Sequence, residues 1–179
     1  MTGRIWTFSN TLSAARVLAA VPISVLLLEG SPGSRTWALV LVVFAIATDF
    51  LDGFFARWLH QVSELGKVID PLADKIAVAA VGVILVIEGS LPLWYVGLVL
   101  ARDLLILAGG LVIRSRKRII PQSNWPGKIA VSAIALVMLL AIIDRPGLEP
   151  LEAVAFWGSV ALMAVSVGVY ARRLSIGKS

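Results

Sequence analysis

Six long apolar stretches, separated by short polar segments, set the strongest limit on what this chain can fold into. They cover approximately residues 12–30, 35–57, 69–89, 91–113, 127–143 and 150–171. Each is close to the roughly 20 residues that an α-helix needs to cross a membrane. Backbone groups in lipid have no water to bond, so a spanning segment of this length must satisfy them internally, as a helix does. We therefore predict an all-α integral membrane protein with six transmembrane helices.

The composition supports a membrane protein with a single domain over residues 1–179. Hydrophobic residues make up 59% of the 179 residues and charged residues 15%, whereas soluble domains are about 45–50% apolar and about 25% charged. The first apolar stretch lacks the small-residue cleavage site of a secretory signal peptide, so we expect it to remain in the protein. Because the chain has no cysteine, disulfide and thiolate chemistry are excluded.

Basic residues are distributed unevenly between the polar segments. Arg35 is the only basic residue between stretches one and two, and Arg145 is the only one between stretches five and six. In contrast, 11 of the 16 Lys and Arg residues fall on the opposite side. Loops rich in Lys and Arg stay in the cytoplasm. We expect both termini, including a short N-terminal segment, to be cytoplasmic, in a bacterial inner or plasma membrane. The net charge of +5 favours contact with anionic lipid, and nothing indicates nucleic-acid binding.

Four aspartates lie where the second apolar stretch ends and the third begins. Ionisable groups inside spanning helices are costly and usually mark functional sites. Asp49 and Asp52 are three positions apart, and Asp70 and Asp74 are four apart, so each pair shares one face of its helix. Only residues 58–65 join the two helices, which makes them antiparallel neighbours. If the two faces meet, four carboxylates converge at the cytoplasmic side.

Four converging carboxylates repel one another and cannot all stay ionised without cations. Hard divalent ions such as Mg²⁺ or Mn²⁺ prefer oxygen ligands, and the chain offers no Cys and one His. Gly53 and Ala56 flank the acids and let a phosphorylated ligand approach the backbone, although small residues also serve helix packing in membranes. Arg57 has the geometry to pair with phosphate oxygens, or it anchors the helix at the cytoplasmic face.

Taken together, these residues resemble a known signature. The run Asp49-x2-Asp52-Gly53-x2-Ala56-Arg57-x8-Gly66-x3-Asp70-x3-Asp74 is similar to the complete signature of the CDP-alcohol phosphatidyltransferases. The resemblance implies an enzyme that displaces CMP from CDP-diacylglycerol with the hydroxyl of a second substrate, and it implies a homodimer.

The resemblance also assigns roles to single residues. It implies two metal ions, one held by Asp49, Asp52 and Asp70 and the other by Asp49, Asp70 and Asp74. Asp74 would also be the general base that takes the proton of the acceptor hydroxyl. The implied CDP-lipid site consists of Gly53, Ala56, Arg57, Ser63, Gly66, Asn10 and Ser13. Asn10 and Ser13 come from a stretch at the start of the first helix that is similar to the family, and a simple helix start is the alternative.

The acceptor alcohol is defined less closely. Many members of the family use a phosphorylated polyol, so the resemblance implies a cationic pocket for the acceptor. The candidates near the cytoplasmic ends of the later stretches are Arg118, Lys128 and Arg172, with topology as their alternative role. Residues 70–75 resemble phosphatidylglycerophosphate synthases most, which favours glycerol 3-phosphate. However, the Thr and Gln that usually follow Gly127-Lys128 are replaced here. Phosphatidylglycerol, as in the related cardiolipin synthases, and an inositol phosphate are therefore open alternatives.

Arg102 and Asp103, in the fourth stretch, resemble an Arg-acid pair of the same synthases. Neighbours on a helix point about 100° apart, so the sequence leaves open whether these two side chains pair.

A cation transporter is the main non-enzyme alternative, but the acids gather near one face and the chain has no inverted repeat. A degenerate family member that only binds lipid is a further alternative, and the intact signature argues against it.

Overall fold

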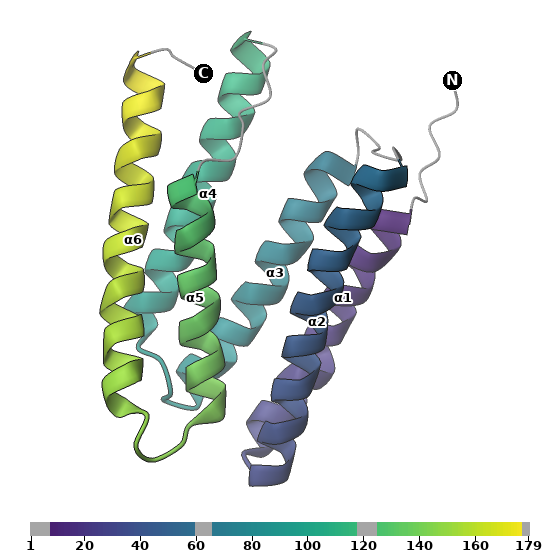
Figure 1. Ribbon diagram of the computed structural model, residues 1–179, viewed down its shortest axis with the longest axis vertical. Helices are drawn as coiled ribbons and strands as arrows, with labels where there is room; N and C mark the ends of the chain where they lie inside the picture. Colours follow the sequence, from purple (N-terminus) through teal and green to yellow (C-terminus); the bar gives the residue numbers. More distant parts are fainter. Residues whose placement is uncertain (1–7, 60–65, 118–124, 177–179) are drawn as a thin grey trace. The chain divides into compact units, whose positions relative to one another are not determined.

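The computed structural model describes the backbone of residues 8–59, 66–117 and 125–176, and over these residues it is all α-helical apart from short turns. Figure 1 shows the helices in chain order. They are α1 (Phe8–Glu29), α2 (Pro32–Leu59), α3 (Gly66–Ile87), α4 (Leu93–Lys117), α5 (Trp125–Ile143) and α6 (Glu149–Ile176). Each apolar stretch expected from the sequence falls on one of these helices, so the prediction of an all-α fold is confirmed.

Three of the described helices contain segments long and apolar enough to cross a membrane. These segments are Leu93–Gly110, Trp125–Ile143 and Glu149–Arg172. In the first half of the chain the described residues include shorter apolar segments, Val17–Glu29 and Pro32–Thr48. The protein is thus an all-helical chain with three candidate membrane spans among its described residues. The six-span topology stays a prediction.

The helix contacts divide the chain into two compact units, residues 1–90 and 91–179. In the first unit α1 packs against both α2 and α3. Leu27 and Leu85 are fully buried in this core. Arg35 near the start of α2 pairs with Glu88 just after α3, with Nη2 3.3 Å from Oε2. The helices alternate in direction, so the start of α1, the end of α2 and the start of α3 lie at the same end of the unit (Figure 1).

Local sequence signals explain why the helices of the first unit end and begin where they do. Gly30 follows α1 with a φ of +69°, and its N–H donates to the carbonyl of Leu27 at 2.9 Å. Glycine adopts this left-handed conformation without a steric penalty, and it is therefore favoured after a helix. Ser31 then caps α2, because its Oγ accepts the N–H of Ser34 at 3.1 Å. Pro32 follows at the first helical position, where a missing N–H costs nothing.

In the second unit α6 packs against both α5 and α4. Ile142 and Met163 are among the most deeply buried apolar side chains of this unit. An aromatic cluster lies where α4 and α6 begin, at the lower end of these helices in Figure 1. Tyr95 and Phe156 stack in it with ring centroids 4.6 Å apart, and the two tryptophans of the cluster are exposed. Tryptophan and tyrosine collect at membrane–water interfaces, so this end of the unit has the character of an interface.

Three polar contacts set the register of α4 against α6. In each contact the α6 residue lies 64 positions after the α4 residue, so the two helices run parallel with one constant offset. Each contact has a donor–acceptor distance of 3.2 Å or less. The pairs are Tyr95–Ser159 at 2.8 Å, Arg102–Ser166 at 3.0 Å, and Tyr170–Ile106, in which the hydroxyl of Tyr170 donates to the backbone carbonyl at 3.2 Å.

Candidate active site

The signature residues occupy helix ends in the first unit. Asp49 to Arg57 lie in the last eleven residues of α2, and Gly66 to Asp74 lie in the first nine residues of α3. Residues 10–13, also expected to contact the nucleotide, lie in the first turns of α1. All three helix ends belong to the same end of the unit (Figure 1). The backbone at both predicted acidic pairs is therefore helical, as the sequence indicated.

The side chain of Asp74 is the one carboxylate of the signature that the structure describes. It is half-buried on α3, next to the half-buried Lys75 and the buried Ala73. The side chains of Asp49, Asp52 and Asp70 lie outside the described residues. Within the described part, no group of three or more His, Cys, Asp or Glu side chains gathers as a metal site. The two-metal site stays a prediction.

Several other predicted contacts also lie outside what the structure describes. Ser63 and Arg118 fall in the segments 60–65 and 118–124. Asn10, Ser13, Gly53, Ala56, Arg57 and Gly66 are placed on helices as backbone only. Their roles in the CDP-lipid site remain predictions, and the same holds for Arg118 in the acceptor site.

Two of the predicted acceptor residues lie in the described part of the second unit. Lys128 is exposed in the first turn of α5, and its Nζ lies 5.8 Å from the ring centroid of Trp125. A cation over the face of tryptophan is attracted by the ring electrons, with about 0.5–1 kcal/mol at an exposed position. Arg172 is exposed near the end of α6. Both side chains are thus accessible on helices that pack against each other.

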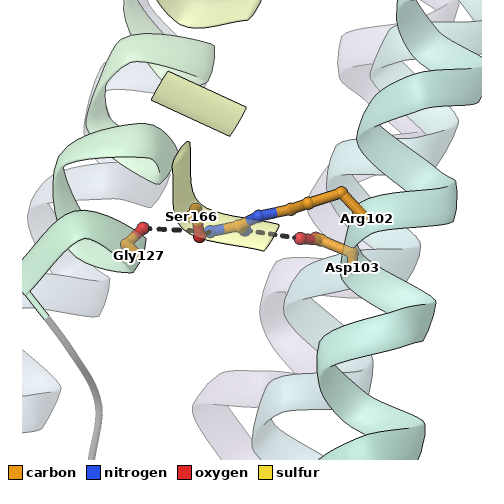
Figure 2. Close-up of polar contacts among 4 residues, drawn as sticks. All are labelled: Arg102, Asp103, Gly127 and Ser166. Carbon is orange, nitrogen blue, oxygen red and sulfur yellow. Dashed lines mark hydrogen bonds and ion pairs between the residues drawn. The ribbon is translucent and has the colours of Figure 1, made fainter. Parts of the chain in front are cut away.

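Arg102 is a buried cation in the middle of α4, and the sequence alone did not reveal its surroundings. Its side chain is 4% exposed. Figure 2 shows it crossing from α4 towards α5 and α6. Nη1 donates to Oδ1 of Asp103 at 2.7 Å, and Nη2 donates both to Oγ of Ser166 at 3.0 Å and to the carbonyl of Gly127 at 3.1 Å. The neighbouring pair that the sequence left open does form.

These contacts explain how a charge is tolerated among apolar helices. A buried ion needs an opposite charge and hydrogen bonds to offset its lost hydration. Asp103 supplies the charge, and Ser166 and Gly127 supply further acceptors. Nε of Arg102 is buried without a hydrogen-bond partner. Breaking such a network by removing one partner usually costs several kcal/mol, about 3–5, so Arg102 is fixed in place by all three helices of the unit.

Comparison with known proteins decides the family. Residues 6–165 match the family model of the CDP-alcohol phosphatidyltransferases. The chain belongs to this family. The match covers α1 to α5 and most of α6, including both helix ends that carry the aspartates.

Similar proteins include two groups with different names. The chain is 36% identical over 162 residues to a cardiolipin synthase (CMP-forming) of Streptomyces coelicolor, covering 87% of this chain and 75% of that protein. It is also 31% identical to a CDP-diacylglycerol–glycerol-3-phosphate 3-phosphatidyltransferase of Cereibacter sphaeroides, covering 97% of this chain and 77% of the relative. A protein of the same name from Bacillus subtilis is 27% identical, with 90% and 92% covered.

These findings confirm the predicted family and the predicted class of enzyme. The protein is a CDP-alcohol phosphatidyltransferase, and it uses CDP-diacylglycerol and an alcohol acceptor as members of this family do. The two groups of relatives correspond to the two kinds of enzyme that the sequence resembles, the phosphatidylglycerophosphate synthases and the cardiolipin synthases. One name states cardiolipin as the product and the other states glycerol 3-phosphate as a substrate, and the acceptor is the part of the function that the sequence left open.

Proposed function

We propose that the protein transfers the phosphatidyl group of CDP-diacylglycerol to glycerol 3-phosphate and releases CMP. The observation that carries this proposal is the intact signature, which lies on helix ends at one end of the first unit within a family match over residues 6–165. Relatives named for this reaction align with nearly the whole chain.

The donor set of the signature fits a pair of divalent cations. Four carboxylates, from Asp49, Asp52, Asp70 and Asp74, offer only oxygen ligands, which Mg²⁺ and Mn²⁺ prefer. Two such ions would neutralise the diphosphate and stabilise the leaving CMP. The proposal therefore includes two bound ions per site, with Asp49 and Asp70 shared between them.

Asp74 has the second role of general base. A carboxylate that lies within reach of the acceptor hydroxyl takes its proton as the oxygen attacks phosphorus. The new phosphorus–oxygen bond forms while the bond to the CMP oxygen breaks, and the electron pair leaves with CMP. Asp74 is half-buried on α3.

The nucleotide and lipid diphosphate would lie against the small residues of α2 and α3. Gly53, Ala56 and Gly66 permit close approach, Arg57 pairs with phosphate oxygens, and Ser63 contributes from the connecting segment. At the start of α1, Asn10 and Ser13 add polar groups.

Cationic residues of the second unit would bind the acceptor. Lys128 and Arg172 are exposed, and Arg118 precedes α5 in the sequence. A phosphomonoester carries up to two negative charges and is attracted to such groups. Glycerol 3-phosphate fits this requirement and brings the hydroxyl that attacks.

The same proposal places the reaction at the cytoplasmic face of the bacterial inner or plasma membrane. Six spans with both termini in the cytoplasm agree with the distribution of Lys and Arg. The acyl chains of the donor then stay in the bilayer while its head group meets a water-soluble acceptor. We expect a homodimer, and the exposed apolar side chains of α4 and α6, such as Leu104 and Trp157, are available for contact with lipid or a second copy.

Phosphatidylglycerol is the second candidate acceptor. The observation that favours it is the 36% identity to the Streptomyces coelicolor cardiolipin synthase. Both acceptors contain a glycerol joined to phosphate, so the same cationic residues serve either one.

A mass-spectrometric assay of the purified protein separates the candidates. The protein is given CDP-diacylglycerol and Mg²⁺ with glycerol 3-phosphate, phosphatidylglycerol, inositol phosphate or serine in parallel reactions. We expect CMP and phosphatidylglycerol phosphate from the first reaction. Cardiolipin from the second reaction alone would reassign the acceptor, and the absence of CMP from every reaction would contradict the proposed activity.

A further inference from the structure

The first turn of α5 is attached to the side chain of Arg102. The carbonyl of Gly127, the third residue of α5, accepts a hydrogen bond from Nη2 at 3.1 Å. The same Nη2 donates to Ser166 of α6 at 3.0 Å. One guanidinium therefore fixes the start of α5 relative to both neighbouring helices (Figure 2).

This attachment sets how deep α5 begins between its neighbours. Arg102 lies 15 residues before the end of α4, and Ser166 lies 10 residues before the end of α6. With a rise of 1.5 Å per residue, the first turn of α5 lies about 22 Å inside the end of α4 and about 15 Å inside the end of α6. Figure 1 shows the upper end of α5 well short of those two helix ends.

Lys128 directly follows the anchored residue. Its Cα position is set by the backbone at Gly127, and its ammonium group rests 5.8 Å from the ring centroid of Trp125. The first turn of a helix lacks partners for its N–H groups and frays easily, and a glycine adds backbone freedom there. The bonds of Arg102 tie this turn to α4 and α6 directly before Lys128.

We propose that Arg102 is a positioning residue for the acceptor site, because it anchors Gly127 and thereby places the ammonium of Lys128 where the acceptor phosphate binds. Arg102 itself is buried, so the proposed role is indirect. The inference rests on the proposed acceptor role of Lys128. It adds that binding of the acceptor phosphate depends on a buried residue in another helix.

Kinetics with each substrate varied in turn test this role. Arg102→Met removes all the hydrogen bonds of the side chain, and we expect the KM for the acceptor to rise by about tenfold or more. The KM for CDP-diacylglycerol should stay within about twofold, because its predicted residues lie in the first unit. Arg102→Lys keeps the charge and one donor group, so it should restore part of the loss.

Two further variants distinguish positioning from general stability. Tyr95→Phe removes the Tyr95–Ser159 hydrogen bond between the same two helices but leaves the start of α5 untouched, so it should not change the acceptor KM. In a Lys128→Met background, Arg102→Lys should produce no further rise in that KM, since the group that it positions is already gone.

The two KM values and the thermal stability together decide whether Arg102 positions Lys128. Equal changes in both KM values, or a loss of thermal stability with unchanged KM values, would overturn the proposal. If the Arg102 variants do not fold, Ser166→Ala replaces them, since it removes one partner and keeps the arginine. A rise of about threefold in the acceptor KM supports positioning, and an unchanged KM refutes it. Failure of the proposed function is separate, because the unmodified protein would then release no CMP with any acceptor.

Discussion

Gly109 of α4 lies against the ring of Tyr170 of α6, and a single added methyl group should disturb this contact. A Cβ added at Gly109 would lie 2.7 Å from Cε1 and 2.8 Å from the hydroxyl oxygen of Tyr170. Real Cβ atoms almost never come within 3.0 Å of another heavy atom. The ring of Tyr170 must therefore move, and its hydrogen bond to the carbonyl of Ile106 at 3.2 Å is then lost or weakened.

The net effect of Gly109→Ala follows from three contributions. Overpacking costs about 1–3 kcal/mol, and the lost hydrogen bond costs about 1 kcal/mol. Replacing glycine by alanine inside a helix returns about 1 kcal/mol. The protein should be destabilised by about 1–3 kcal/mol, which lowers Tm by roughly 2–4 °C for each kcal/mol in a chain of this length.

Gly97→Ala is the matched control, because it lies in the same helix and its added Cβ has no neighbour within 4 Å. It should raise Tm by about 2 °C through helix propensity alone. Thermal unfolding in one detergent, with both variants measured in parallel, gives the comparison. In a Tyr170→Leu background the penalty of Gly109→Ala should largely disappear. A Tm for Gly109→Ala equal to or above that of Gly97→Ala would refute the close contact.

The remaining predictions concern chemistry and one ion pair. Asp74→Asn should fold and still bind CDP-diacylglycerol but lose at least about 99% of turnover, since a general base contributes about 10²–10⁴-fold; unchanged turnover would exclude Asp74 as the base. Removal of divalent ions with EDTA should abolish CMP release, and Mg²⁺ or Mn²⁺ but not Ca²⁺ should restore it; full activity in EDTA would contradict the metal site. Glu88→Gln should cost about 1 kcal/mol, because its pair with Arg35 is largely buried at 10% and 20% exposure; a Tm equal to that of the unmodified protein would show that the pair contributes nothing.

Much of the fold could be predicted because each apolar stretch must form a helix in lipid. The expected stretch at 127–143 ends at the residue where α5 ends. The helices extend further than predicted at their polar ends, where α4 continues to Lys117 and α6 to Ile176. The hydrophobicity of the sequence does not predict these additional turns, because a helix continues past the hydrocarbon region of the membrane as long as no residue breaks it.

The helical placement of the acidic residues could also be predicted, because carboxylates at steps of three and four share one helix face, whereas the metal and nucleotide sites stay predictions. The hydrogen-bond network around Arg102 could not be predicted from the sequence. Gly127 takes part through a backbone carbonyl, which no sequence pattern reports. Ser166 is one of several serines in α6, and only its spacing of seven from Ser159 and four from Tyr170 places it on the face towards α4.

The residues predicted for the two substrates lie in different halves of the sequence. Every residue predicted to bind the metals or CDP lies between positions 10 and 74, whereas the predicted acceptor residues lie between 118 and 172. Of the three polar contacts between α4 and α6, only the one from Arg102 also reaches α5. Changes at Arg102 or Ser166 can therefore move Lys128 without altering the signature. The proposal therefore predicts that changes at this anchor alter binding of the acceptor and leave binding of CDP-diacylglycerol unchanged.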